Sequence, residues 1–133
     1  KKLNIKIVSF DELISISDII SLHSNAPKNS QPLFDINHFK KMKKSSFIIN
    51  TARGNLINEN DLNIALKDNI IAGAGIDVFS TEPAKDNILF KNPKVILTPH
   101  IAASTEESQI KVAEMISEQI SNFFIHNKII NTV

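Results

Sequence analysis

Four short apolar runs, separated by stretches with helical spacing, most limit the folds open to this chain. The runs occupy residues 18–23, 47–50, 71–78 and 94–97. Helices are expected before, between and after them, at residues 11–16, 35–44, 60–69 and 104–123. Asp11 and Asp35 are the expected N-caps of the first two helices, and Ser104 and Glu107 form a capping box before the last. Buried apolar strands that alternate with helices predict an α/β fold with a parallel sheet.

Composition and charge exclude several classes of protein. The chain has 133 residues, 42% of them hydrophobic, and a formal net charge of +1. Its length fits one domain of roughly 100 to 200 residues, and its charge gives no electrostatic footprint for a nucleic acid or membrane partner. No apolar run approaches the roughly 20 residues that cross a bilayer. The absence of cysteine fits the reducing cytoplasm. His38 and His126 have no cysteine or histidine at ligand spacing, so no metal site is expected.

Three polar residues of catalytic type follow apolar runs. Arg53, Glu82 and His100 each come just past such a run, at the edge where an open α/β sheet gathers its ligand-binding groups. The planar fork of an arginine grips carboxylate and carbonyl oxygens, a histidine carries a proton, and a carboxylate holds that histidine in its charged form. The three together suit a keto acid or a hydroxy acid.

Each of these side chains also has an ordinary structural explanation. Taken alone, Arg53 is explained as a surface arginine, His100 as a turn residue and Glu82 as a plain turn carboxylate. Their order and their common placement after strands favour a joint catalytic role.

Longer segments around the three residues carry a family resemblance. Residues 50–54, 74–83 and 98–104, in this order, resemble the NAD-dependent D-isomer-specific 2-hydroxyacid dehydrogenases. The resemblance extends from about Phe10 to the end of the chain, and the runs 81–84 and 104–109 are most similar to the branch of the family that oxidises 3-phosphoglycerate. It implies a Rossmann-like, doubly wound parallel sheet, with Arg53, Glu82 and His100 as the catalytic residues.

The resemblance also implies a reaction and a cofactor. The reaction is hydride transfer between C4 of a nicotinamide and C2 of a small 2-hydroxy or 2-keto acid. The cofactor is NAD, and the residues implied to bind it are Ser24, Thr51, Ala52, Arg53, Asp77, His100, Ile101, Ala102 and Ala103. Asp77 interrupts an apolar run, where a carboxylate is costly unless it has a partner, and the family uses this position to hold the nicotinamide carboxamide.

Glycine is too scarce for a complete dinucleotide site. The three glycines are Gly54, Gly73 and Gly75, so no G-x-G-x-x-G turn occurs. Residues 1–133 are therefore expected to be part of an NAD-binding domain, its second half. The glycine-rich half and the substrate domain would belong to a longer parent, which is expected to be a homo-oligomer.

Several functions stay open at this point. Other 2-hydroxyacid dehydrogenases and glyoxylate or hydroxypyruvate reductases are alternatives within the family. The corepressor relatives, the C-terminal-binding proteins, keep the three residues but act as NAD-sensing interaction proteins, and an inactive remnant of a truncated gene would also carry them. The residues present choose neither the substrate nor between NAD and NADP, and NAD is the family default.

Overall fold

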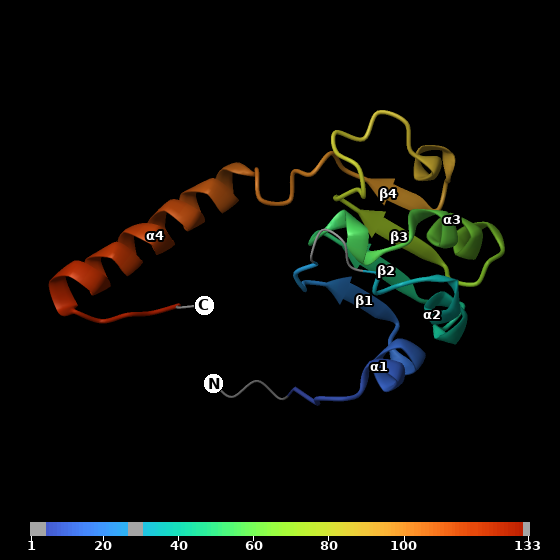
Figure 1. Ribbon diagram of the computed structural model, residues 1–133, viewed down its shortest axis with the longest axis horizontal. Helices are drawn as coiled ribbons and strands as arrows, with labels where there is room; N and C mark the ends of the chain where they lie inside the picture. Colours follow the sequence, from blue (N-terminus) through green and yellow to red (C-terminus); the bar gives the residue numbers. More distant parts are fainter. Residues whose placement is uncertain (1–4, 27–30, 132–133) are drawn as a thin grey trace. The chain divides into compact units, whose positions relative to one another are not determined.

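A computed structural model describes residues 5–26 and 31–131, and the chain divides into two units, Lys1–His100 and Ile101–Val133. The first unit holds a four-stranded parallel sheet in the order β1-β2-β3-β4. Its strands are β1 (Ile19–Leu22), β2 (Phe47–Asn50), β3 (Gly73–Ile76) and β4 (Val95–Leu97). Their arrowheads all point toward the same edge of the sheet (Figure 1). The prediction of a Rossmann-like parallel α/β sheet is confirmed.

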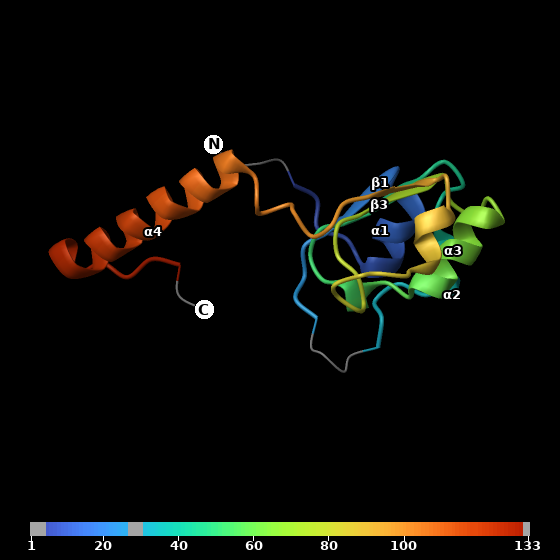
Figure 2. The same ribbon diagram turned by 90° about the horizontal axis from the view of Figure 1, so that it is seen from above.

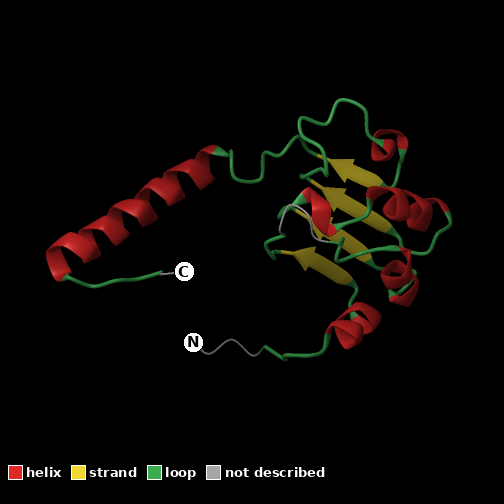
Figure 3. Ribbon diagram, viewed as in Figure 1, coloured by secondary structure: helices red, strands yellow, loops and turns green. Residues whose placement is uncertain are grey.

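One helix precedes the first strand, and two helices and two short 3-10 turns connect the strands. They are α1 (Phe10–Ile16), α2 (Ile36–Lys41), η1 (Gly54–Leu56), α3 (Glu59–Lys67) and η2 (Ile88–Lys91), and Figure 3 distinguishes them from the strands by colour. Each α-helix overlaps a predicted helix, with boundaries that differ by up to three residues, whereas the two 3-10 turns were not predicted.

Capping side chains explain where these helices begin. The predicted N-cap Asp35 is confirmed, because its carboxylate accepts hydrogen bonds from the backbone N–H groups of Asn37 and His38. The predicted cap Asp11 is wrong: Ser9 caps α1 by accepting from the N–H of Glu12 at 3.2 Å, which places Asp11 inside the first turn. The Ser9 hydroxyl accepts from the amide of the third helical residue, so the helix begins two residues earlier than it would with Asp11 as the cap.

The direction of winding places the core on one face of the sheet. Each strand pairs with the one before it, so the crossovers all advance in the same direction. Right-handed crossovers then put every connecting helix on the same face, and α1, α2 and α3 gather on one side of the strands (Figure 2). The core between these helices and the sheet includes Ile14, Ile20, Leu22, Phe34, Phe39, Ile48, Leu62, Ala65, Leu66, Ile76 and Leu89.

Within the first unit, no helix covers the opposite face of the sheet, whereas the sequence predicted strands buried on both faces. Ile19 is paired with Phe47, and these side chains are 63% and 47% exposed, while Ile96 is 77% exposed. Their inward-facing neighbours Ile20 and Ile48 are buried. A continuous apolar run predicts cover on both faces, whereas the helices of this unit cover only one.

The second unit contains one long helix. Helix α4 (Glu106–His126) has 21 residues and is capped by Thr105, whose side chain accepts from the N–H of Ser108. The predicted capping box at Ser104 and Glu107 therefore starts one residue too early. Among the residues that the structure describes, no helix is long and apolar enough to span a membrane.

Candidate active site

Three loops at the carboxyl edge of the sheet carry the residues predicted to be catalytic. Arg53 follows β2, Glu82 follows β3 and His100 follows β4. Parallel strands present these ends side by side, which is why residues far apart in sequence meet here.

Asn50 shapes the loop that carries Arg53. This residue ends β2, is 1% exposed, and donates from Nδ2 to the carbonyl oxygen of Arg53 at 2.9 Å. Its Oδ1 accepts from the N–H of Ala52 at 3.1 Å. A buried amide that satisfies both a donor and an acceptor fixes the turn. No role was predicted for Asn50 from the sequence, although an amide that closes an apolar run is a signal of such a turn.

Gly54 lets this loop approach the next one. A Cβ atom at position 54 would overlap the carbonyl group of Phe79 and the backbone nitrogen of Ser80. Only glycine permits this contact between backbones. The loop with Arg53 is thereby seated directly against the loop that leads to Glu82.

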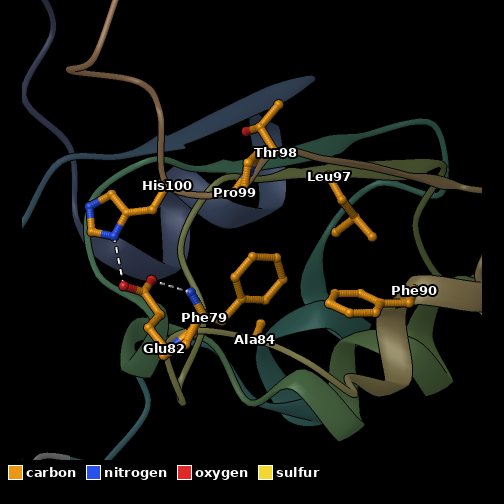
Figure 4. Close-up of a pocket in the computed structure, with 9 residues that line it drawn as sticks. Phe79, Glu82, Ala84, Phe90, Leu97, Thr98, Pro99 and His100 are labelled. Carbon is orange, nitrogen blue, oxygen red and sulfur yellow. Dashed lines mark hydrogen bonds and ion pairs between the residues drawn. The ribbon is translucent and has the colours of Figure 1, made fainter.

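Glu82 links its own loop to His100. Its Oε1 accepts from the backbone N–H of Phe79 at 2.9 Å, and its Oε2 lies 2.7 Å from Nδ1 of His100 (Figure 4). The N–H of Phe79 foremost, and then the hydrogen bond to His100, lower the pKa of the Glu82 carboxyl below its ordinary value. The carboxylate is therefore ionised at neutral pH and orients the imidazole.

The backbone at His100 is left-handed, with φ of 56°. This conformation costs a residue with a Cβ atom roughly 1–2 kcal/mol, and such residues cluster at functional sites.

Two residues before His100, the hydroxyl of Thr98 donates to Oδ1 of the buried Asp77. The end of β4 is thus tied to the end of β3.

The structure brings Arg53, Glu82 and His100 to one cleft. The three residues line a depression of about 340 Å³. Its other walls include Gly54, Asn55, Val78, Phe79 and Ser80. Nη1 of Arg53 donates to the carbonyl oxygen of Ala52 at 2.7 Å, so the guanidinium is held at the loop. A cation, a carboxylate and an imidazole at one cleft can bind a carboxylate and move a proton beside it.

A second, more apolar cleft adjoins the first. It measures about 620 Å³ and shares Phe79, Glu82 and His100 with the first cleft. Its other walls are Pro83, Ala84, Phe90, Leu97, Thr98 and Pro99. The rings of Phe79 and Phe90 meet edge to face with centroids 5.8 Å apart (Figure 4).

Several residues predicted to bind the cofactor share a third cleft. Ser24, Thr51, Ala52 and Arg53 line it with His23 and Asn25, and its volume is about 370 Å³. It lies at the carboxyl ends of β1 and β2. Ile101, Ala102 and Ala103 belong to the second unit, so their role remains a prediction. In the described part of the chain, no three His, Asp or Glu side chains form a group that could hold a metal ion.

The first unit has the architecture of half a Rossmann-like nucleotide-binding domain, with its polar groups at the carboxyl edge of the strands. Residues 1–102 match the family described as D-isomer specific 2-hydroxyacid dehydrogenase, NAD binding domain, and the chain belongs to this family. NAD is the cofactor that this domain family binds.

Known relatives and solved structures agree with this assignment. The chain is 41% identical over 123 residues to D-3-phosphoglycerate dehydrogenase of Bacillus subtilis, a match that covers 92% of this chain and 23% of the relative. It is 40% identical over 116 residues to glyoxylate reductase of Thermococcus litoralis, covering 87% of this chain and 35% of the relative. A crystal structure of a glyoxylate reductase from Paecilomyes thermophila superposes with a TM-score of 0.77 at 33% identity, over 95% of this chain and 38% of that one. The chain therefore spans about a quarter to two fifths of these relatives.

Proposed function

We propose that this chain is the second half of the NAD-binding domain of a D-2-hydroxyacid dehydrogenase, whose glycine-rich half and substrate domain lie elsewhere in a longer parent. The observation that carries the proposal is the 2.7 Å contact between Glu82 and His100 in a cleft that they share with Arg53. Family membership supports the same assignment.

The proposed roles follow from which ring nitrogen of His100 contacts Glu82. Nδ1 of His100 faces Glu82, so Nε2 is the nitrogen that faces the substrate, takes the hydroxyl proton during oxidation and returns it to the carbonyl oxygen during reduction. Glu82 holds the imidazole in one orientation through its contact with Nδ1. Arg53 binds the substrate carboxylate and stabilises charge that develops on the carbonyl oxygen.

The residues present fit the nicotinamide end of the cofactor. Ser24 and the backbone of residues 51–53 line a polar cleft at the ends of β1 and β2, and the carboxylate of Asp77 is buried at the end of β3. These residues, with the segment 100–103, are proposed to hold NAD. When bound, NAD supplies or accepts the hydride.

For the substrate we favour 3-phosphoglycerate, oxidised to 3-phosphohydroxypyruvate in serine biosynthesis by a cytoplasmic homo-oligomer. The 41% identity to the Bacillus subtilis D-3-phosphoglycerate dehydrogenase supports this choice. Reduction of glyoxylate or hydroxypyruvate is the second candidate, because the identity to a glyoxylate reductase is nearly as high.

Two experiments test these proposals. Sequencing the coding DNA upstream of Lys1 is expected to show a G-x-G-x-x-G turn within an open reading frame. The full-length enzyme is then assayed by nicotinamide absorbance with 3-phosphoglycerate and NAD, and with glyoxylate or hydroxypyruvate and NADH. The highest kcat/KM is expected for 3-phosphoglycerate, and a higher value for glyoxylate would favour the second candidate.

The 133-residue chain alone is expected to be inactive. Without the glycine-rich turn the pyrophosphate has no helix N-terminus to bind, and the exposed sheet face leaves the chain prone to aggregate. Isothermal titration with NADH and an absorbance assay are expected to show neither micromolar binding nor turnover. Measurable binding or turnover would overturn the assignment as half of a cofactor site.

A further inference from the structure

A carboxylate outside the catalytic trio connects α3 to the loop that carries Glu82. Glu59 is the first residue of α3, and its Oε1 accepts from the backbone N–H of Ser80 at 2.8 Å. Its Oε2 accepts from the hydroxyl of Ser80 and from the side-chain amide of Asn87, each at 2.9 Å. All three hydrogen bonds cross between elements that are 21 to 28 residues apart in sequence.

These bonds hold the short turn on which Glu82 depends. Ser80 follows Phe79, whose backbone N–H donates to Oε1 of Glu82 at 2.9 Å. The other oxygen of Glu82 contacts Nδ1 of His100. A shift of Ser80 would therefore move the amide that orients the Glu82 carboxylate toward the imidazole.

Glu59 also lies on the segment that carries Arg53. That segment runs from Arg53 through η1 into α3, and Gly54 already packs against Phe79 and Ser80. Glu59 makes a second attachment between the same two loops, formed by hydrogen bonds to an ionised group. Bonds of this kind are stronger than those between neutral groups.

We propose that Glu59 is a positioning residue that fixes the turn 79–82, and through it holds the Glu82–His100 pair at a set distance from Arg53. The inference deepens the proposed function, because the pair matters for acid–base chemistry only if that function is right. The hydrogen bonds of Glu59 go to Ser80 and Asn87, so it acts on the pair through these two residues.

A carboxylate in the first turn of a helix also stabilises that helix through the macrodipole. A substitution at Asp61 separates this macrodipole effect from the effect of the hydrogen bonds to Ser80 and Asn87. It lies in the same first turn, but its Oδ2 accepts from the backbone N–H of Ile36 at 3.1 Å, away from the Ser80 turn. Asp61→Asn is therefore the matched control for Glu59→Gln.

The test measures the turn in the full-length protein, with no need for catalysis. The Glu82 side-chain carboxyl is titrated by 13C NMR, and hydrogen exchange is followed at the amide of Phe79. In Glu59→Gln the midpoint of Glu82 is expected to rise toward the ordinary value of a glutamate, and the Phe79 amide is expected to exchange roughly two- to tenfold faster, as the loss of one hydrogen bond predicts. Unchanged values in a folded Glu59→Gln chain, or equal shifts in Asp61→Asn, would overturn the proposal.

A swap of donor and acceptor sharpens the test. In Glu59→Gln combined with Asn87→Asp, the new amide donates to the new carboxylate. The carboxylate at position 87 can still accept from the N–H of Leu89, as Asn87 does. The swap is expected to restore the titration of Glu82 and the exchange of Phe79. A folded double variant that behaves like Glu59→Gln would show that the hydrogen bonds are not what positions the turn.

Folding and function are checked separately. If circular dichroism shows that Glu59→Gln is unfolded, Ser80→Ala is used instead, because it removes the hydroxyl that donates to Oε2 of Glu59. The titration of Glu82 and the exchange of the Phe79 amide are then measured in that variant. In the full-length enzyme, Glu59→Gln is expected to lower kcat with little change in the KM for NAD. If the full-length enzyme shows the expected changes in Glu82 titration and Phe79 exchange and yet has no activity on any hydroxy acid, that result would support the positioning role of Glu59 and overturn the proposed function.

Discussion

The side chains proposed to react are exposed, whereas the groups that hold their loops are buried. The side chains of His100 and Glu82 are 51% and 35% exposed, and Arg53 is exposed as well. Beneath them, Asn50 and Gly54 are buried and in contact with the backbones of the same loops. Chemistry and stability therefore rest on different residues, and substitutions can separate the two.

The largest effect is expected for His100→Asn in the full-length enzyme. General acid–base catalysis contributes about 10²- to 10⁴-fold, so kcat falls by that factor while the affinity for NAD changes little. Stability also changes little, because an exposed ion pair contributes about 0–1 kcal/mol. Steady-state kinetics and urea unfolding measure the two quantities, with His126→Asn as the control. Turnover close to that of the unsubstituted enzyme would remove His100 from the reaction.

The next effect is expected for Arg53→Lys. Arg53 is the only arginine of the chain, and lysine keeps its charge but loses the planar fork that binds a carboxylate with two parallel bonds. Hydrogen bonds to charged groups are worth about 1.5–3 kcal/mol, so kcat/KM for the acid substrate is expected to fall roughly 10- to 150-fold. Unchanged kcat and KM would mean that Arg53 does not bind substrate.

Gly54→Ala, made in the full-length protein, tests whether the buried contacts between the loops stabilise the fold. The new methyl would overlap the backbone of Phe79 and Ser80, and overpacking of this kind costs about 1–3 kcal/mol. Gly75→Ala is the matched control, because a Cβ atom there meets Ile49 at 3.8 Å, an ordinary contact. Urea unfolding is expected to show a lower midpoint for the first variant only. Equal stability of the two variants would show that the loops are not seated as described.

The smallest effect is expected for Glu82→Gln and depends on pH. The pKa of Glu82 is lower in the folded chain than in the unfolded chain, so its carboxylate stabilises the fold above the unfolded pKa. This contribution is lost as the pH falls through the folded pKa. The difference in unfolding free energy between Glu82→Gln and the unsubstituted chain is therefore expected to be present at neutral pH and to shrink in acid.

The same substitution is expected to lower kcat for keto acid reduction by less than His100→Asn does, because the imidazole of His100 loses the carboxylate that orients it. Urea unfolding across a pH series and steady-state kinetics measure the two effects. Glu114→Gln, a change of an exposed carboxylate within α4, is the control. A stability difference that is constant with pH would contradict the described environment of Glu82.

Local sequence signals predicted the elements and the meeting of Arg53, Glu82 and His100, because strand ends in a parallel sheet share an edge. They did not predict which neighbours support the site. Asn50 forms its hydrogen bonds within the turn that follows β2, and Glu59 forms its hydrogen bonds with residues more than 20 positions away. Neither set of partners can be recognised before the chain is folded. The uncovered face of the sheet was not predicted either, because an apolar run does not show whether helices cover one face of a strand or both.

The order of the strands also sets the order in which the site is assembled. Because each strand pairs with the one made just before it, a chain growing at roughly 5–20 residues per second completes the loop of Arg53 first, then that of Glu82, and His100 only with β4. For an interval on the order of seconds, the nascent sheet carries a carboxylate and a guanidinium without the group proposed to move the proton. A chain that ended before β4 would carry Arg53 and Glu82 but could not perform the proposed chemistry.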